Sequence, residues 1–424
     1  MNILIIGSGG REHAIINSIS KSKRCSKIFA LPGNAGTELL AENVVGDVND
    51  FELIKKISLK NKISLVFVGP EDPIVNGIYD FFKSDSQLKN INIIAPSKQA
   101  GYLEGSKDFA KDFMEKYNIP TAKHKTFSTE NLDMADKFLE SMRPPYVLKA
   151  DGLAAGKGVL IIQDLNEAKS ELRSMILEKK FGDSSAKVVI EEFLDGIELS
   201  CFVLTDGINY KVLPFAKDYK KIGEGDTGLN TGGMGAISPV PFLDDKFLSK
   251  IQNKIIKPTV GGIIKEKMPY NGFIFIGLIK VKDEPFVIEY NVRMGDPETE
   301  VVFPRLNNDM LELLDSMGTP KFNDIKLSIN NNHAATVILV SGGYPKSYEK
   351  EKTITGLNDL SNDLIFHAGT NKKDNTFITN GGRVLAVTSM AKDFNQALKS
   401  SYSKIEKINF DGMYYRKDIG FDLL

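Results

Sequence analysis

The first 101 residues alternate short apolar runs with amphipathic stretches, and this alternation constrains the fold more than any other feature of the sequence. Apolar runs occur at 3–6, 28–30, 65–68 and 91–95, and the stretch 12–20 has one apolar helical face. Strands that alternate with helices are typical of a parallel, doubly wound α/β sheet. We therefore expect an N-terminal Rossmann-like domain, with ligands at the carboxyl ends of its strands.

Glycine-rich turns follow the first three apolar runs and therefore face one crevice. The first turn, 7–11, invites comparison with a dinucleotide-binding fingerprint, but Glu12 stands where that fingerprint needs a small residue. No acidic residue follows the second run to hold a ribose hydroxyl. The turn is better suited to a single phosphate monoester, bound by backbone amides at a helix N-terminus with Arg11 beside them. A tight turn needed only for packing is the alternative.

A second glycine-rich turn, 149–158, lies between two apolar runs. It resembles a Walker A loop but has three residues rather than four between its glycines, and Gly158 replaces the serine or threonine that would bind magnesium. The pattern favours a hairpin flap whose backbone amides approach a triphosphate, with charge from Lys149 and Lys157. A flexible hairpin with solvated lysines is the alternative.

Two acidic segments follow predicted strands. In the first, 189–198, the residues after the strand can offer backbone groups to a purine edge while Glu198 reaches a sugar hydroxyl, although such acids are usually only solvated. In the second, period-two alternation places Glu289, Asn291 and Arg293 on one strand face. A carboxylate and an amide oxygen suit Mg²⁺ held together with phosphates, and the arginine can stabilise a transferring phosphoryl group. A solvent-facing polar edge is the alternative.

The rest of the chain divides into further units. A capped helix at 107–117 is interpreted as a connector, and 123–191 contains the flap. Segment 222–235 is so polar and glycine-rich that we expect a mobile active-site loop. Asparagines and a proline at 320–333 mark a boundary, after which 334–424 form a smaller unit.

Composition argues against nucleic acid and membranes as partners and against an oxidising compartment. The 424 residues include 54 Lys+Arg against 55 Asp+Glu, so there is no electrostatic reason to expect nucleic acid or an acidic membrane as a partner. The apolar runs fall short of the ~18 residues that a membrane helix needs. The two cysteines, Cys25 and Cys201, exclude a disulfide framework, and the four histidines suggest no catalytic triad. Since the first residues lack the basic segment of a signal peptide, we expect a cytoplasmic protein.

Together these stretches resemble the phosphoribosylamine–glycine ligase family of the ATP-grasp superfamily. The match covers essentially the whole chain, and several runs belong to this family rather than to ATP-grasp enzymes in general. The matching runs are Gly9-Gly10-Arg11-Glu12-His13, Pro32-Gly33-Asn34-Ala35-Gly36, Leu103-Glu104-Gly105-Ser106-Lys107, 149–158, 191–196, Asn230-Thr231-Gly232-Gly233-Met234-Gly235, Gly295-Asp296-Pro297-Glu298-Thr299, Gly342-Gly343-Tyr344-Pro345, His367-Ala368-Gly369-Thr370, Asn380-Gly381-Gly382-Arg383-Val384 and Arg416-Lys417-Asp418-Ile419-Gly420.

The resemblance implies an ATP-grasp fold of mixed α/β and α+β class. It places an N-terminal Rossmann-like, phosphoribosylamine-binding domain at 1–101, a core lobe at 102–122 plus 192–327, a flap lobe at 123–191 and a small C-terminal domain at 328–424. The implied reaction joins glycine to 5-phosphoribosylamine with hydrolysis of ATP to ADP and phosphate, through glycyl phosphate, in the second step of purine synthesis. The implied cofactor is Mg²⁺ or Mn²⁺, and we expect a monomer or at most a weak homodimer.

The resemblance also implies a role for individual residues. ATP would contact Lys107, Lys149, Gly156, Lys157, Glu191, Glu192, Phe193, Leu194 and Glu198, with adenine framed by 191–194 largely through backbone groups. The metal would be held by Glu289 and Asn291. The reacting groups would be placed by Arg293, Asp218, Asp296 and Glu298, and the substrates by Gly9, Gly10, Arg11, Asn34, Glu71, Thr231 and Gly232.

Three positions depart from the family pattern. The strand before Glu289 has no second acidic metal ligand, so phosphates, water or another group would complete the metal shell. Leu229 replaces an expected proline and Ser8 an expected asparagine. The nearest alternative is another ATP-grasp ligase or carboxylase of the purine pathway. An oxidoreductase, against which Glu12 argues, and a non-catalytic nucleotide-binding module are alternatives from other classes.

Overall fold

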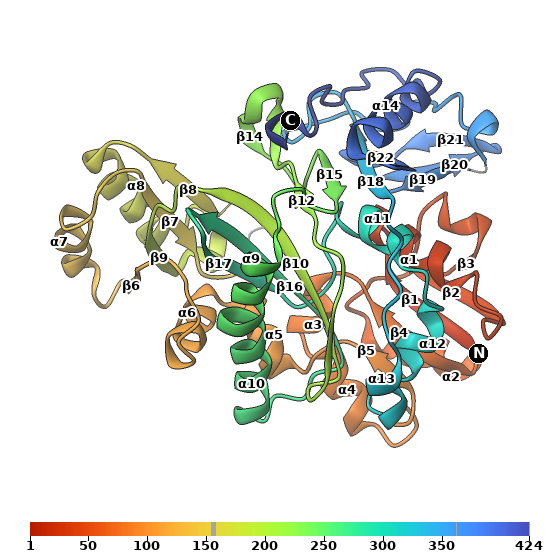
Figure 1. Ribbon diagram of the computed structural model, residues 1–424, viewed down its shortest axis with the longest axis horizontal. Helices are drawn as coiled ribbons and strands as arrows, with labels where there is room; N and C mark the ends of the chain where they lie inside the picture. Colours follow the sequence, from red (N-terminus) through yellow and green to blue (C-terminus); the bar gives the residue numbers. More distant parts are fainter. Residues whose placement is uncertain (154–157, 362, 424) are drawn as a thin grey trace.

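The N-terminal sheet has the parallel α/β arrangement that the alternation of apolar runs predicts. In the computed structural model, which describes residues 1–153, 158–361 and 363–423, five parallel strands lie in the order β3-β2-β1-β4-β5 (Figure 1). Because β1 pairs with both β2 and β4, the turns after these three strands meet at one edge of the sheet. The elements are β1 Asn2–Gly7, α1 Gly10–Ile19, β2 Lys27–Pro32, β3 Glu42–Asn43, α2 Phe51–Lys60, β4 Ile63–Val68, α3 Glu71–Val75, α4 Ile78–Ser84, β5 Asn92–Ile94 and α5 Lys98–Gly105.

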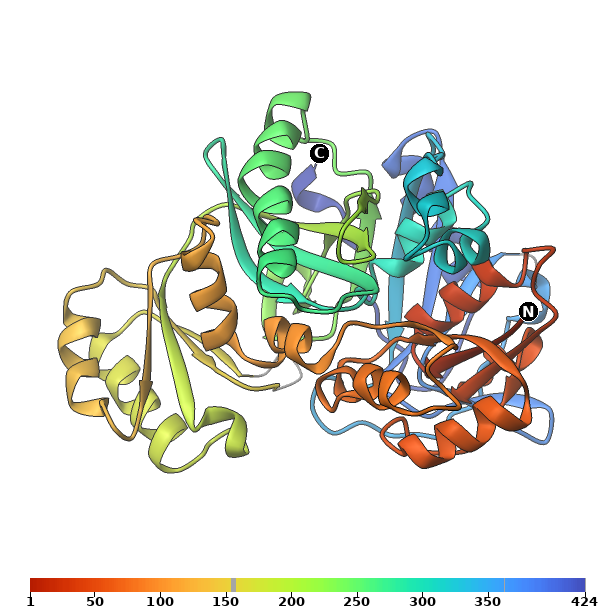
Figure 2. The same ribbon diagram turned by 90° about the horizontal axis from the view of Figure 1, so that it is seen from below.

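A capped helix leads from this sheet into the flap. The Ser106 hydroxyl accepts a hydrogen bond from the Phe109 amide (3.1 Å), which confirms the predicted start of α6. The flap is an antiparallel sheet of order β6-β9-β7-β8 with two helices, at one end of the molecule (Figure 2). Its hydrophobic cluster contains only residues from 127 to 190. The elements are α6 Lys107–Lys116, β6 His124–Ser128, α7 Ala135–Glu140, β7 Tyr146–Ala150, β8 Val159–Ile162, α8 Leu165–Leu177 and β9 Lys187–Glu192.

The core lobe shares its hydrophobic interior with the N-terminal sheet. Its antiparallel sheet has the order β11-β10-β16-β17, and the rings of Phe67 and Phe273 lie 5.7 Å apart between the two sheets. A long helix formed by α9 and α10, joined through a wider turn at Gln252–Ile256, covers the lobe. The elements are β10 Ile197–Thr205, β11 Tyr210–Val212, α9 Asp245–Ile251, α10 Lys257–Lys265, β16 Gly272–Val281 and β17 Glu284–Asn291.

The C-terminal sheet includes strands from an earlier part of the chain. Its order is β12-β15-β18-β22-β19, so β12 and β15, which lie inside the range expected for the core lobe, belong to it. Pairing with β15 covers an edge of β18 that would otherwise be open. Residues 334–424, predicted to form a smaller separate unit, therefore share their main sheet with two strands from the range expected for the core lobe. The elements are β12 Lys217–Asp218, β15 Gly235–Ser238, β18 His333–Val340, β19 Leu364–His367, β20 Thr370–Lys373, β21 Thr376–Thr379, β22 Arg383–Ala391 and α14 Phe394–Ile405.

The segment 222–235 is more regular than the mobile loop that its composition predicts. Strands β13 (Lys221–Gly223) and β14 (Thr227–Asn230) form an antiparallel hairpin. Arg416, which is fully buried, contacts Asp226 (2.6 Å), and Asp418 accepts a hydrogen bond from the Gly225 amide (2.7 Å). The polar residues that suggested a loop therefore attach this hairpin to the C-terminal segment.

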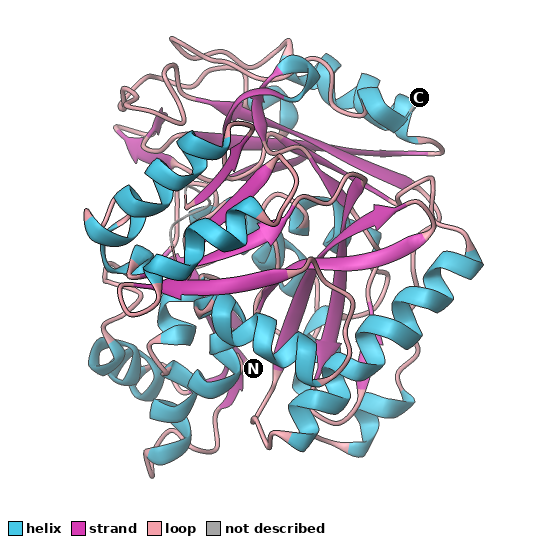
Figure 3. Ribbon diagram, turned by 90° about the vertical axis from the view of Figure 1, so that its left-hand side faces the viewer, coloured by secondary structure: helices cyan, strands magenta, loops and turns pink. Residues whose placement is uncertain are grey.

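Short helices connect the lobes on the far side of the N-terminal sheet. α11 (Thr299–Val302), α12 (Met310–Asp315) and α13 (Pro320–Asp324) follow the core lobe, and Val301 and Leu311 pack in one cluster with residues of β1 and β4. Helices flank the layers of strands throughout (Figure 3). None of the helices in the described ranges is long and apolar enough to span a bilayer.

Candidate active site

Two buried lysines share one carboxylate at the base of the flap. Lys149 on β7 and Lys111 on α6 each place their Nζ atom 3.0 Å from Oε2 of Glu191 on β9. Burial alone would raise the pKa of Glu191, but the two lysines outweigh it and the pKa is lowered. The Lys149 Nζ atom also lies 3.5 Å from the Ile288 carbonyl of β17, so it bridges flap and core lobe. The Glu191 side chain thus faces two lysines, and its backbone pairs with β6 on one side and β7 on the other.

The turn after β9 offers backbone groups as predicted. Within the described part of the chain, the amides of Phe193 and Leu194 donate no hydrogen bond, and Phe193 is 41% exposed. The Glu192 carboxylate accepts from the Lys123 amide (2.9 Å), so it holds the end of β6 rather than facing a ligand. Glu198, which we expected at a ribose, is paired with Lys220 at 2.5 Å, and Lys220 lowers its pKa.

The N-terminus of α6 is tied to the end of β7. The Asp151 carboxylate accepts from the Asp108 amide (2.8 Å) and the Ser106 hydroxyl (3.0 Å). The predicted phosphate ligand Lys107, the first residue of α6, donates to the Gly152 carbonyl (3.3 Å). Gly156 and Lys157, the remaining predicted ligands of this turn, lie outside the described residues.

The predicted metal ligands and the predicted arginine meet at the end of β17. Asn291 is the last residue of the strand, and its Oδ1 accepts from Nη2 of Arg293 (3.2 Å). In the part of the chain described, the Glu289 carboxylate makes no hydrogen bond or ion pair with protein, and the buried Nδ2 of Asn291 has no partner. No group of three His, Cys, Asp or Glu suited to a metal occurs in those residues. These oxygen donors fit a Mg²⁺ or Mn²⁺ ion whose other ligands come from phosphates and water.

Gly277 of β16 stands opposite Glu289 on the strand that lacks a second acid. It pairs with Glu289, and a Cβ atom at this position would lie 3.3 Å from Cγ of Glu289. This is a tight contact that a small shift of the Glu289 side chain would relieve. β16 itself presents no acidic residue beside Glu289.

Arg293 is held by acidic residues of the N-terminal domain. Its Nη2 lies 2.8 Å from Oε1 of Glu104, and its Nε lies 3.5 Å from Oε2 of Glu71. The other Glu104 oxygen accepts from the Val292 amide (2.8 Å), and burial raises the pKa of Glu104 to about 7. The sequence contains Glu104 within one of the matching runs, but nothing in its pattern indicated this contact.

A buried pair of carboxyl groups lies between the core lobe and the C-terminal sheet. Glu298 is 3% exposed and accepts from the Ser200 hydroxyl (3.1 Å); burial first, and then Asp218, raise its pKa to about 7. Burial also raises the pKa of Asp218, which lies 3.7 Å from Lys220. Lys220, which we did not predict, thus contacts both Asp218 and Glu198. The carboxyl pair formed by Glu298 and Asp218 is suited to accept a proton near neutral pH.

The N-terminal turn is closed by Glu12. The Glu12 carboxylate accepts from the Gly9 amide and from Nε of Arg11, both at 2.6 Å. A Cβ atom at Gly69 would lie 1.9 Å from Oε1 of Glu12. Glu12 therefore fills the space that a dinucleotide-binding turn keeps open, in agreement with the mismatch seen in the sequence. The Arg11 guanidinium also donates to the Met294 carbonyl (3.1 Å), so two sides of it already have protein partners.

Arg383 of β22 joins the turn containing Asp296 to the glycine-rich segment. It lies 3.0 Å from Oδ1 of Asp296 and donates to the Gly232 carbonyl (2.7 Å). The other Asp296 oxygen accepts from the Arg11 amide (3.2 Å). Thr231 donates to the Lys220 carbonyl (2.7 Å). Arg383, which was not predicted, therefore joins Asp296 to Gly232, and Asp296 also meets the Arg11 amide.

Asn34 and Gly10, both predicted to contact substrate, are packed against other parts of the protein. All hydrogen-bonding groups of the Asn34 amide contact protein: Nδ2 donates to the Ser8 and His367 carbonyls, and Oδ1 accepts from the Gly36 and Thr37 amides. In this structure Asn34 shapes its turn rather than presenting a free amide. Glu300 is fully buried, and a Cβ atom at Gly10 would lie 2.4 Å from its Oε1. The backbone at Gly10 is therefore packed directly against this carboxyl group.

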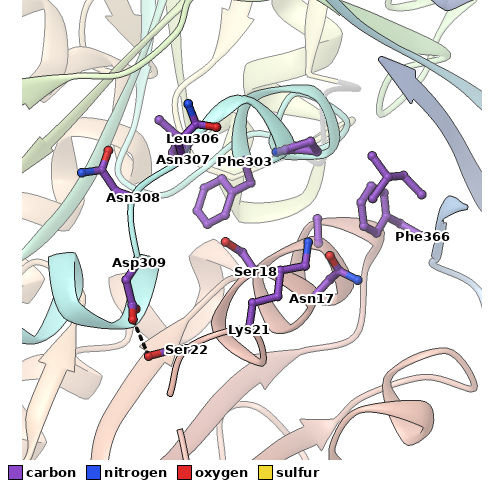
Figure 4. A pocket seen from close by; sticks show the side chains of 13 residues that line it. Asn17, Ser18, Lys21, Ser22, Phe303, Leu306, Asn307, Asn308, Asp309 and Phe366 are labelled. Carbon is purple, nitrogen blue, oxygen red and sulfur yellow. Dashed lines mark hydrogen bonds between the residues drawn. The ribbon is translucent and has the colours of Figure 1, made fainter. Parts of the chain in front are cut away.

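A separate cavity lies on the other side of α1, away from these residues. It has a volume of about 300 Å³ and is lined by Asn17, Ser18 and Lys21 of the α1 region and by Phe303, Asn308 and Phe366, among others (Figure 4). Ser22 donates to Asp309 at its rim (2.7 Å). None of the predicted site residues lines this cavity.

Comparisons with known proteins show which family the sequence matches. Family models described as the phosphoribosylglycinamide synthetase N domain, ATP-grasp (A) domain and C domain match residues 1–104, 105–299 and 334–422. The chain is 44% identical over 419 residues to the phosphoribosylamine–glycine ligase of Caldanaerobacter subterraneus, with 99% of each chain covered. It is 41% identical to that of Pseudomonas aeruginosa, covering 99% of this chain and 98% of the relative.

Solved structures show the same fold. The crystal structure of phosphoribosylamine–glycine ligase from Thermotoga maritima matches with a TM-score of 0.84 and 35% identity, covering 99% of this chain and all of the other. The biotin carboxylase–β,γ-ATP complex from Campylobacter jejuni matches with a TM-score of 0.73 at 16% identity, over 97% of this chain and 92% of the other. The predicted ATP-grasp fold is thereby confirmed.

Proposed function

The chain belongs to the phosphoribosylglycinamide synthetase family, and we propose that it uses ATP to join glycine to 5-phosphoribosylamine. Members of this family are ligases, and the reaction is the second step of purine biosynthesis. One observation carries the proposal: the end of β17 brings the flap lysine Lys149, the oxygen donors Glu289 and Asn291, and the arginine Arg293 together. Phosphate-binding charge, metal-type ligands and a phosphoryl-stabilising cation are what a carboxylate-activating ligase needs in one place.

The reaction has two steps in this proposal. A carboxylate oxygen of glycine attacks the γ-phosphorus of ATP, the bond to the β–γ bridging oxygen breaks, and ADP leaves glycyl phosphate behind. The amine of 5-phosphoribosylamine then attacks the carbonyl carbon, phosphate leaves with its C–O electron pair, and the amine loses a proton. Phosphorylation is needed because a carboxylate is a poor electrophile, and the acyl phosphate must be kept from water. The products are glycinamide ribonucleotide, ADP and phosphate.

Residues of this chain supply positioning and charge. Lys107 and Lys149 contact the phosphates, and the backbone of 193–194 meets the adenine edge. Arg293 stabilises the transferring phosphoryl group because Glu104 and Glu71 hold its guanidinium in place. Glu298, whose pKa is raised to about 7, takes the proton released by the amine, with Asp218 beside it.

Glu289 and Asn291 hold the metal ion, which balances phosphate charge when bound. Phosphoribosylamine lies against the turn at Gly9–Arg11 at the start of α1. The Gly9 and Arg11 amides already donate to Glu12 and Asp296, so the positive end of the helix and the Gly10 backbone are what this turn contributes. Asn34 supports this turn from beneath, since its amide is already hydrogen-bonded to protein. The choice of Mg²⁺ over Mn²⁺, the monomeric state and the cytoplasmic location stay predictions.

The test is coupled ADP release with each substrate left out in turn. Repeated turnover to ADP should need both glycine and phosphoribosylamine, and alanine should not replace glycine. Turnover that depends on bicarbonate or formate instead would favour another ATP-grasp reaction. ADP release without glycine would contradict the two-step scheme, because the glycine carboxylate is the group that attacks ATP.

The metal ligands are tested by a matched pair of substitutions on β17. Glu289→Ala should lower metal-dependent turnover by about 10³-fold without loss of the fold, since the ion loses its carboxylate ligand. Glu284→Ala is the control, because Glu284 lies on the same strand but pairs with surface residues Lys250 and Lys254. Near wild-type rates in Glu289→Ala would refute the metal assignment.

A further inference from the structure

We propose that Lys111 is a positioning residue that leaves Lys149 available to nucleotide phosphate, because it shares the carboxylate of Glu191 with that lysine. The inference rests on the proposed function in one respect, namely that Lys149 binds ATP. It adds a role for a residue on the connector helix α6, which precedes the flap and contributes no predicted ligand except Lys107.

Lys111 is fixed in a polar contact inside an apolar face. It is 2% exposed, and its neighbours on the buried side of α6 include Ala110 and Met114. Its Nζ atom donates to the Thr121 hydroxyl (2.7 Å), which in turn donates to the Val287 carbonyl of β17 (2.7 Å). The ammonium group is therefore aimed at Glu191 from the connector, while Lys149 reaches the same oxygen from the flap.

The charge balance of this cluster depends on Lys111. Two ammonium groups and one carboxylate carry a net charge of +1, and both lysines contact the same oxygen, Oε2, while the buried Oε1 has no partner among the described residues. Without Lys111, Glu191 would pair with Lys149 alone, and that pair would be neutral. In a buried site of low dielectric constant, this difference acts strongly on a nearby triphosphate. Lys111 thus keeps positive charge on the side of Lys149 that faces the nucleotide.

A pH dependence follows from the same contacts. Burial lowers the pKa of Lys111 to about 8. The positive charge of Lys149 lowers this pKa further, whereas the negative charges of Glu191 and Glu192 raise it. When pH rises through this value, Lys111 loses its proton and no longer shares Glu191. The wild-type protein at pH 9 should therefore bind nucleotide like a variant that lacks the ammonium group.

The experiment measures the Kd of ATP in the presence of Mg²⁺ by calorimetry on the full chain, without glycine, from pH 7.5 to 9.5. This range lies above the last phosphate ionisation, near pH 6. The affinity of the wild-type protein for ATP should fall by about tenfold from pH 7.5 to 9.5, as expected when one charge is lost at close range. Lys111→Met should be weak by that factor at pH 7.5 and nearly independent of pH. Lys111→Arg, whose charge persists above pH 12, should bind tightly throughout.

Two controls separate the inference from the proposed function. Lys116→Met removes an exposed lysine from the same helix and should leave both Kd and its pH dependence unchanged. Lys149→Met should weaken binding at every pH; if it does not, the ATP site itself is misplaced and the inference falls with it. If Lys149→Met weakens binding but Lys111→Met matches wild type, only the sharing role is wrong. A pH dependence retained in Lys111→Arg would also overturn it, even if Lys111→Met fails to fold.

Discussion

The flap and the N-terminal sheet meet their neighbours in opposite ways. The hydrophobic cluster of the flap contains only flap residues, from Phe127 to Ile190. The clusters on the two faces of the N-terminal sheet continue into the core lobe, and Ala14 of α1 packs within the C-terminal cluster. The flap therefore shares no hydrophobic cluster with its neighbours, although Val147 and Val189 are buried on the sheet face that carries Lys149 and Glu191. We expect rotation of the flap to expose less apolar surface than separation of the N-terminal sheet from its neighbours would.

Polar contacts attach the flap to the connector helix. Asp151 caps α6, Lys187 pairs with Asp108 (2.8 Å), and Glu191 meets Lys111. The exposed contacts can be exchanged for water or for ligand groups at small net cost, unlike buried apolar area. The Glu191–Lys111 contact is buried, so we expect it to be kept or replaced by ligand groups. We therefore expect the flap to be the part that moves to close over a nucleotide, while the N-terminal sheet and the core lobe stay rigid.

The largest expected effect compares two phenylalanines. Phe273→Ala, in the interior shared by two lobes, should lower the free energy of unfolding by about 3–5 kcal/mol and weaken the N-terminal sheet and core lobe together. Phe127→Ala should lose a similar amount only within the flap. Hydrogen exchange read by segment checks this. Loss of protection outside residues 123–192 in Phe127→Ala would show that the flap is not an independent unit.

A smaller effect is expected from acid. Burial, aided by His367, lowers the pKa of His13 to about 3 at the contact between α1 and the C-terminal unit. Below pH 6.5 the unfolded chain takes up a proton that the folded chain does not, so stability present above pH 6.5 is lost as pH falls toward 3. The loss from this residue is about 2 kcal/mol between pH 6.5 and 5. His13→Asn keeps an acceptor for the His367 amide, so its free energy of unfolding, measured in urea, should fall less than that of wild type between pH 6.5 and 5. An equal fall in both proteins would contradict the assignment to His13.

Helix caps sharpen the comparison at the level of single contacts. Asp151→Ala should reduce protection of the first amides of α6 by about 1 kcal/mol, because the cap comes from the flap. Asp164→Ala removes the cap of α8, where Asp164 accepts from the Glu167 amide within the flap (2.8 Å). It should leave α6 unchanged. Equal effects of both substitutions on α6 would mean that the flap and the connector are one unit.

The smallest effect is expected for an exposed ion pair of the flap. Arg173 and Asp136 lie 2.9 Å apart and join α8 to α7, with both side chains partly exposed to solvent. Arg173→Ala should lower stability by less than ~1 kcal/mol, with no change in nucleotide affinity. Thermal unfolding and the Kd of ATP check this. A larger loss would show that polar contacts, and not its apolar cluster, hold the flap together.

Local patterns made much of this molecule predictable. The parallel sheet, the flap strands and the meeting of Asn291 with Arg293 follow from periodicity and from turns over a few residues. The missed residues act over long distances in the sequence: Arg383 reaches Asp296, Glu104 reaches Arg293, and Lys111 reaches Glu191. Their partners are fixed only by the packing of separate units.

The hairpin at 221–230 shows the same limit from another side. Its composition is that of a loop, and its attachment through Arg416 lies almost 200 residues further along the chain. The family resemblance implies a substrate contact for Asn34, but the tertiary structure uses every group of its amide. Residue type indicates what a side chain can do, and only the assembled fold decides what it meets.

The place of β15 in the C-terminal sheet has a consequence for synthesis on the ribosome. β15 is made before β18, and residues 239–332 must be added between them. Ala236 and Ile237, both fully buried in the finished sheet, therefore wait for their neighbours for roughly 5–20 s at ordinary translation rates. A nascent chain in this interval exposes an apolar strand edge, and this is the stage at which a chaperone would have most to protect.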